Sequence, residues 1–92
     1  MTTVYQQAVF TLGKSLESFE KSIHACDMHK MLDENVAFVE TLKNTNNTFE
    51  SLPPKVRNTE AETHIKSKEL VQKYFDTKFK INDTCSVVAQ HR

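Results

Sequence analysis

The sequence is poor in residues that break helices. Among its 92 residues there are one glycine and two prolines, and the prolines are adjacent at positions 53 and 54. So few breakers favour long helices over a strand-rich fold with many tight turns. A chain of this length forms one small domain with a thin core, which a partner would help to stabilise.

Charge of one sign is also missing, because 12 basic and 12 acidic residues cancel to a formal net charge of zero. This balance gives no indication of nucleic acid or of an acidic membrane surface as a partner. No apolar run approaches the ~18 residues of a membrane span, and no N-terminal segment resembles a signal peptide. We therefore expect a cytoplasmic protein with no membrane insertion.

Cysteine is scarce too. Cys26 and Cys85 lie far apart in the sequence and make no disulfide framework, so we expect both thiols to be reduced in an intracellular protein. The triplets that begin at Asn46 and Asn82 match the N-glycosylation pattern, and they carry no meaning without a secretory route.

What the sequence does contain is a heptad seam near its start. Apolar residues recur there at spacings of four and three over three repeats: Tyr5, Val9, Leu12, Leu16, Phe19, Ile23 and Cys26. This spacing places the side chains on one narrow stripe of a helix, which must be buried against another helix. A strand would need alternation of apolar and polar residues, and this segment has none.

The helical pattern weakens just before Asp27, whose carboxylate is a suitable N-cap for a second helix. We therefore predict a tight turn near residues 25–28. The alternative is one unbroken helix over about residues 3–43, which would require a dimeric coiled coil.

The second helix is predicted to run from about Met28 to Lys43. It is expected to end at residues 44–48, because their short polar side chains compete for backbone hydrogen bonds. Its buried stripe should comprise Met28, Leu32, Val36, Val39 and Leu42, widened by Met31 and Phe38.

A third helix is predicted to start between Pro54 and Glu60 and to run to about Lys80, with Thr59 and Glu62 as a capping box. It has two apolar faces. The richer face should pack on the first two helices and holds Ala61, Ile65, Val71, Phe75 and Phe79. The other holds Val56, Leu70, Tyr74 and Ile81, and it needs a partner, a second copy of the chain or the C-terminal tail to cover it.

The predicted fold is all-α: an antiparallel helical hairpin plus a third long helix, forming a three-helix bundle over residues 1–81, with dimerisation left open. Residues 82–92 show no helical period, so we expect a loosely ordered tail. Residues 1–43 carry a net charge of −2 and residues 55–80 a net charge of +3, which favours docking of the third helix on the hairpin.

Few residues suggest chemistry. His24, Cys26 and His29 are close in sequence, and such side chains bind zinc, but their spacing is not that of a standard ligand pair. Cys26 with His29 or His64 could form a nucleophile pair, but nothing supplies an oxyanion hole. We therefore expect a non-enzymatic protein with no metal or cofactor.

We instead expect a partner-binding surface, because exposed contiguous apolar side chains usually mark an interaction site. The candidates are the residues of the second apolar face, Val56, Leu70, Tyr74 and Ile81. The Phe10 side of the first helix is the next candidate.

The segment HACDMHKMLDENVAFVETL at residues 24–42, followed by the two prolines, resembles the flagellar export chaperones of the FliT type and other small helical chaperones of type III secretion. The resemblance covers about residues 5–80. It implies a cytoplasmic chaperone that binds an amphipathic segment of an export substrate, with a last helix that regulates access to the binding groove. Two other functions stay open: a self-assembling coiled-coil subunit, and a small phage- or plasmid-type inhibitor of a larger host protein.

Overall fold

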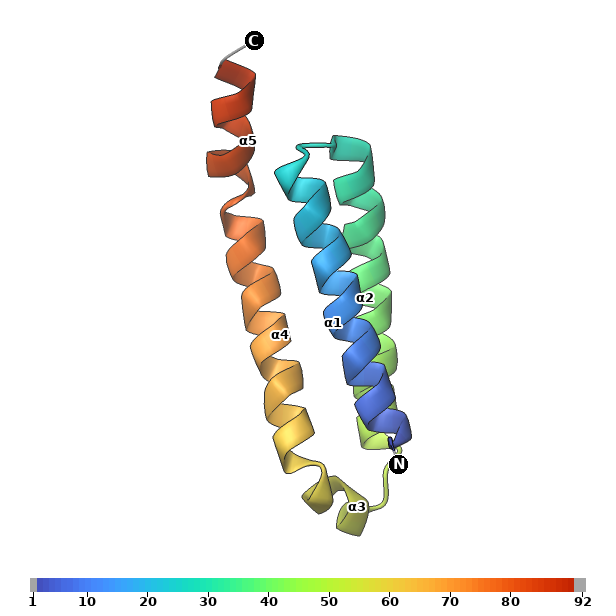
Figure 1. Ribbon diagram of the computed structural model, residues 1–92. Helices are drawn as coiled ribbons and strands as arrows, with labels where there is room; N and C mark the ends of the chain where they lie inside the picture. The colour runs from blue at the N-terminus through green and yellow to red at the C-terminus, as the bar shows by residue number, and fades with distance from the viewer. Residues whose placement is uncertain (1, 91–92) are drawn as a thin grey trace.

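The protein is built from helices joined by short connections (Figure 1). The computed structural model describes residues 2–90, and side chains over residues 2–85. In chain order the helices are α1 (Val4–His24), α2 (Met28–Glu50), α3 (Pro54–Thr59), α4 (Ala61–Phe79) and α5 (Ile81–Gln90). No strand occurs in residues 2–90, so the all-α prediction is confirmed.

The heptad seam forms the buried stripe of α1. Tyr5, Val9, Leu12, Leu16, Phe19 and Ile23 are each at most 5% exposed. Most of this stripe packs against α2, which returns antiparallel to α1. The prediction that the seam is buried against a second helix is therefore confirmed.

A tight turn separates α1 from α2, as predicted. Cys26 occupies this turn with a φ of 49°, in the left-handed region that non-glycine residues seldom adopt. Asp27 is the N-cap of α2, and its Oδ1 accepts a hydrogen bond from the Lys30 amide at 3.1 Å. The alternative of one unbroken helix over residues 3–43 is wrong.

The second helix is longer than predicted, because α2 continues through residues 44–48 to Glu50. Hydroxyl groups along it donate to the carbonyl four residues earlier, at 2.7–2.8 Å, from Thr41, Thr45, Thr48 and Ser51. These side chains therefore satisfy their hydrogen-bonding groups within the helix instead of ending it. Thr45 is fully buried against α1, 3.4 Å from the carbonyl oxygen of Ala8.

The predicted third helix is interrupted. Short α3 starts at Pro54 and α4 follows it, with Glu60 between the two. The capping box is wrong: Thr59 Oγ1 donates to the Val56 carbonyl at 2.7 Å, and no side chain caps the start of α4.

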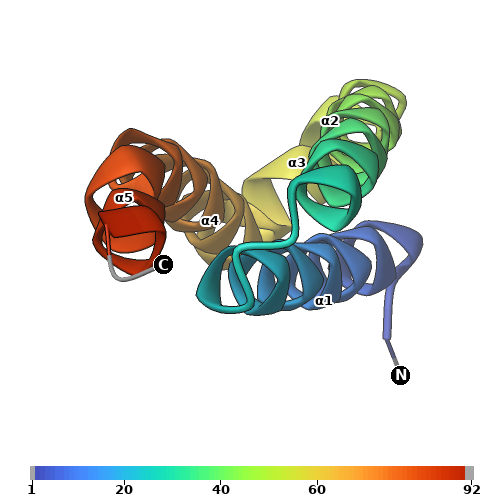
Figure 2. The ribbon, with the colours of Figure 1, turned by 90° about the horizontal axis from the view of Figure 1, so that it is seen from above.

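Helices α2 and α4 both contact α1, but they lie on different sides of it (Figure 2). The molecule is elongated, with extents of 56 × 20 × 18 Å. The hairpin and the added long helix are thus as expected, whereas α2 and α4 do not pack along one another as they would in a closed bundle.

The C-terminal segment also differs from the prediction. Residues 82–90 belong to α5, and only residues 91–92 of the expected tail lie outside the described part. Ile81 and Cys85, four residues apart, share one side of α5 and pack against the core.

Candidate functional site

The register of α2 differs from the prediction and leaves apolar side chains in solvent. Its buried residues are Met31, Phe38 and Thr45, which are seven residues apart and face α1. The expected buried residues Met28, Leu32 and Val36 are exposed, Leu32 to 62%. The prediction is therefore wrong for these three side chains, and α2 carries a second apolar stripe.

The two faces of α4 are exchanged relative to the prediction. Tyr74, expected on the partner-binding face, is 3% exposed and stacks on Phe38 with ring centroids 4.2 Å apart. The face expected to be core is instead in solvent: Phe75 is 47% exposed, Phe79 83%, and Ile65 is exposed too. In this rotation of α4 the Tyr74 ring contacts both Phe19 of α1 and Phe38 of α2.

The other predicted partner-binding residues are not free either. Leu70 and Ile81 are partly buried and pack against the core, while Val56 is half-buried on α3. The expectation that Val56, Leu70, Tyr74 and Ile81 form an exposed stripe is therefore wrong. Whether any of them contacts a partner stays a prediction.

The exposed residues of α2 and α4 lie on one side of the molecule. The Tyr74 hydroxyl donates to Asn35 Oδ1, so the Asn35 side of α2 faces α4. Successive residues of a helix are rotated by ~100° about its axis. Around the circumference of α2, the side chains of Met28 and Leu32 therefore lie beyond Asn35, farther from α1. On α4, the side chain of Phe75 is rotated from Tyr74 in the direction away from α1, so it lies on the same side of the molecule.

We call this surface the open face and define it by Met28, Leu32, Val36, Phe75 and Phe79. Its midline is closed by the Phe38–Tyr74 stack and by the ring of Phe75, which meets Tyr74 edge-on at 5.4 Å. Lys78 Nζ lies 5.5 Å from the centre of the Tyr74 ring, so a cation stands beside the apolar residues.

A second candidate lies between α1 and α4. A pocket of about 250 Å³ is lined there by apolar Val9, Phe10, Gly13, Leu16 and Leu70 and by charged Lys14, Glu17, Glu20, Lys66 and Lys73. Ion pairs Lys14–Glu17 at 3.7 Å and Lys73–Glu20 at 3.6 Å neutralise much of its rim. It holds fewer exposed apolar side chains than the open face, with Phe10 at its edge.

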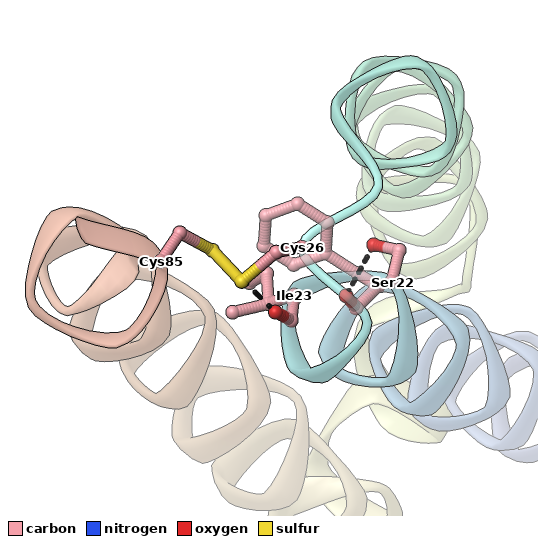
Figure 3. The surroundings of a disulfide bond; sticks show 5 residues. Ser22, Ile23, Cys26 and Cys85 are labelled. Carbon is pink, nitrogen blue, oxygen red and sulfur yellow. Dashed lines mark hydrogen bonds between the residues drawn. A yellow bond between two sulfur atoms is a disulfide. The ribbon is translucent and has the colours of Figure 1, made fainter. Parts of the chain in front are cut away.

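Cys26 and Cys85 form a disulfide that ties α5 to the α1–α2 turn (Figure 3). Their Cα atoms are 5.5 Å apart, within the usual range for such a bond. Cys85 Sγ also lies 3.6 Å from the carbonyl oxygen of Ile23. The expectation that both thiols are reduced is therefore wrong: the fold brings together two residues that are 59 positions apart.

The disulfide bears on whether Cys26 could bind a metal or act as a nucleophile. A disulfide sulfur is neither a thiolate ligand nor a nucleophile, so a site built on Cys26 with His24, His29 or His64 has no thiolate in this state. Over the residues whose side chains are described, no group of three His, Cys, Asp or Glu could hold a metal ion. None of the described helices has the length and apolarity to cross a membrane.

A polar cluster lies at the opposite end, where α1, α2 and α4 meet. The Tyr5 hydroxyl is 3.0 Å from His64 Nδ1, and His64 stacks on Phe49 with centroids 4.1 Å apart. Burial raises the pKa of the Tyr5 hydroxyl, a hydrogen bond with Ser67 lowers it, and the Glu60 carboxylate raises it. The raised pKa favours the protonated phenol, whose hydroxyl links α1 to α4 and whose ring contacts Phe49 of α2.

Comparison of the chain with protein families, with curated proteins and with solved structures finds no match. The open face, the disulfide and the packing of the helices are therefore the features that bear on function.

Proposed function

We propose that this protein is a non-enzymatic protein-binding module whose open face binds an amphipathic helix of a partner. The observation that carries the proposal is the exposure of large apolar side chains along two neighbouring helices, with Leu32 at 62% and Phe79 at 83%. Contiguous apolar surface of this kind usually marks an interaction site.

The mechanism is helix-in-groove recognition. Met28, Leu32 and Val36 are spaced by four residues along α2, and Phe75 and Phe79 share that spacing on α4. A partner helix with apolar residues at corresponding intervals would contact both rows at once. It would then complete a four-helix arrangement with α1, α2 and α4.

The more specific form of the proposal is an export chaperone or adaptor that shields an amphipathic segment, as the resemblance to FliT-type chaperones implies. Such a chaperone works in the cytoplasm, where thiols are kept reduced. The Cys26–Cys85 disulfide instead favours an oxidising compartment. The thiol state of the protein in host cells, measured by alkylation after acid quenching, separates the two settings.

Photo-crosslinking in the native host tests the open face. A photoreactive residue at Val36 should capture a partner through an amphipathic helical segment, whereas one at Phe10, also exposed but on the other side of the hairpin, should not. With the captured segment as a synthetic peptide, Leu32→Glu should weaken binding by about thirtyfold or more, as expected for an interface anchor.

Phe10→Glu is the matched control, because it places the same charge on another exposed apolar position. It should leave both peptide binding and the thermal melt unchanged. Capture at Phe10 alone would move the site to the pocket between α1 and α4. Equal binding by Leu32→Glu and the wild type would show that the open face does not bind the partner.

A further inference from the structure

We propose that the helix bound by the open face is acidic, and that two of its carboxylates, about three turns apart, pair with Lys68 and Lys78 of α4. The inference rests on the proposed function and adds the charge of the partner to it. The distribution of charged side chains around α4 carries the inference.

The charged residues of α4 are sorted by sign around its axis. Its exposed acidic residues recur at spacings of seven, so they share one stripe on the side of α4 away from Tyr74: Glu62, Glu69 and Asp76. Lysines lie on both edges of the helix, between this acidic stripe and the buried side. One basic edge faces α1, and the other borders the open face.

The edge that faces α1 shows what a neighbouring helix supplies to such an edge. Lys66 and Lys73 lie on it and line the pocket between α1 and α4. Across this pocket α1 contributes Glu17 and Glu20, and Lys73 Nζ is 3.6 Å from Glu20 Oε1. A helix packed against this edge of α4 therefore presents carboxylates to its lysines.

The edge that borders the open face is not paired within the chain. Lys68 and Lys78 are exposed there, on the same side of α4 as Phe75. Neither forms an ion pair with another side chain of residues 2–85, and Lys78 lies over the ring of Tyr74. A helix that occupies the open face beside α4 is therefore complementary when it carries acidic residues along this edge.

The spacing of the two lysines sets the spacing of the carboxylates. Lys68 and Lys78 are ten residues apart in the sequence, which is ~15 Å along α4 at 1.5 Å per residue. Two acidic residues about eleven positions apart on a partner helix lie on the same side of it and match this distance. Phe75 lies between the two lysines, so apolar residues of the partner occupy the interval. The exposed charges along the outer part of α2 are mixed and select no sign: Asp33, Glu40 and Lys43.

Three synthetic helical peptides test the inference on the purified full-length chain under non-reducing conditions. They share one row of leucines at spacings of four and three and differ only in the flanking residues, which are all Glu, all Gln or all Lys. By fluorescence anisotropy the Glu peptide should bind about tenfold more tightly than the Gln peptide at low salt, and the Lys peptide most weakly. Because the formal net charge of the chain is zero, overall attraction would not produce this order.

Charge reversals locate the contact. Lys68→Glu and Lys78→Glu should each weaken binding of the Glu peptide by about fivefold, and the double variant should prefer the Lys peptide. Lys66→Glu is the matched control, because it makes the same charge change on the edge of α4 that faces α1. It should leave the affinity for the Glu peptide unchanged.

The outcomes separate the charge of the partner from the proposed function. Equal binding of the three peptides, abolished by Leu32→Glu, would overturn the acidic partner and leave the proposed function standing, as would equal weakening by Lys66→Glu and Lys68→Glu. Failure of all three peptides to bind, or binding that survives Leu32→Glu, would overturn both. A peptide-free mass of twice 10.6 kDa in light scattering, lost in Leu32→Glu, would make a second copy of the chain the occupant and overturn the inference.

Discussion

Removal of the Cys26–Cys85 disulfide should lower the stability of this protein more than most single substitutions. The bond closes a loop between residues 59 positions apart. In the chain-entropy treatment, a cross-link of this span removes unfolded-state entropy worth ~4 kcal/mol at 25 °C. A 92-residue domain has a total stability of roughly 5–14 kcal/mol, so Cys85→Ser should abolish a large share of it.

The assay is urea denaturation followed by helical circular dichroism, with and without a dithiol reductant. Reduction transfers two electrons and two protons from the dithiol to the disulfide, which leaves the Cys26 and Cys85 thiols and the oxidised reductant. The oxidised wild type should be the most stable form. Reduced wild type and Cys85→Ser should share a lower midpoint, and reductant should not change Cys85→Ser further.

A matched pair of variants at position 26 separates loop closure from backbone strain. Both Cys26→Ser and Cys26→Gly remove the disulfide, but only glycine adopts the φ of 49° at this turn without a steric cost. Cys26→Gly should therefore be more stable than Cys26→Ser by about 1 kcal/mol.

Two results would refute this reasoning. The first is a difference of less than ~1 kcal/mol between oxidised and reduced wild type, because the chain-entropy treatment requires several times more. The second is two free thiols per chain in protein kept from reductants, which would show that the bond does not form.

Two further predictions concern the core between α1, α2 and α4. Tyr74→Ala should lower the free energy of unfolding by ~3–5 kcal/mol, because it empties a buried aromatic site. Tyr74→Phe should lower it by only ~1 kcal/mol, through loss of the hydrogen bond to Asn35. An unchanged thermal melt for Tyr74→Ala would show that Tyr74 lies on the surface. Because burial raises the pKa of Tyr5 above its usual value of 10.0, its stabilising effect should be complete below pH ~10 and be lost as the pH rises through the folded-state value. Urea midpoints between pH 8 and 11 should thus fall more steeply for the wild type than for Tyr5→Phe, and parallel curves would contradict this.

The parts of the fold that the sequence predicted are those in which apolar residues alone define the pattern. In α1 the seam from Tyr5 to Ile23 is apolar at every position, so its burial could be read directly. Asp27 marked the start of α2, because its cap is a local interaction between neighbouring residues.

The rotations of α2 and α4 could not be read in this way, because polar residues occupy buried heptad positions. In α2 the buried series is Met31, Phe38 and Thr45, and in α4 Ser67 and Tyr74 continue a series that starts at Glu60. A count of apolar residues omits Thr45, Ser67 and Glu60 and selects the more apolar stripes instead. The Thr45 hydroxyl donates a hydrogen bond to the Thr41 carbonyl, which makes its burial against α1 tolerable. A search for spacings of seven with polar residues allowed would have found both series.

The open face follows from the same observation. Two helices that bury a partly polar stripe retain their more apolar stripes for another surface, and here those stripes hold Leu32 on α2 and Phe75 on α4. If burial in the single chain were the main constraint on the sequence, the more apolar stripe would be the buried one. In both α2 and α4 the more apolar stripe is instead the exposed one, and the two exposed stripes lie on the same side of the molecule. A surface that binds a partner helix would produce this pattern.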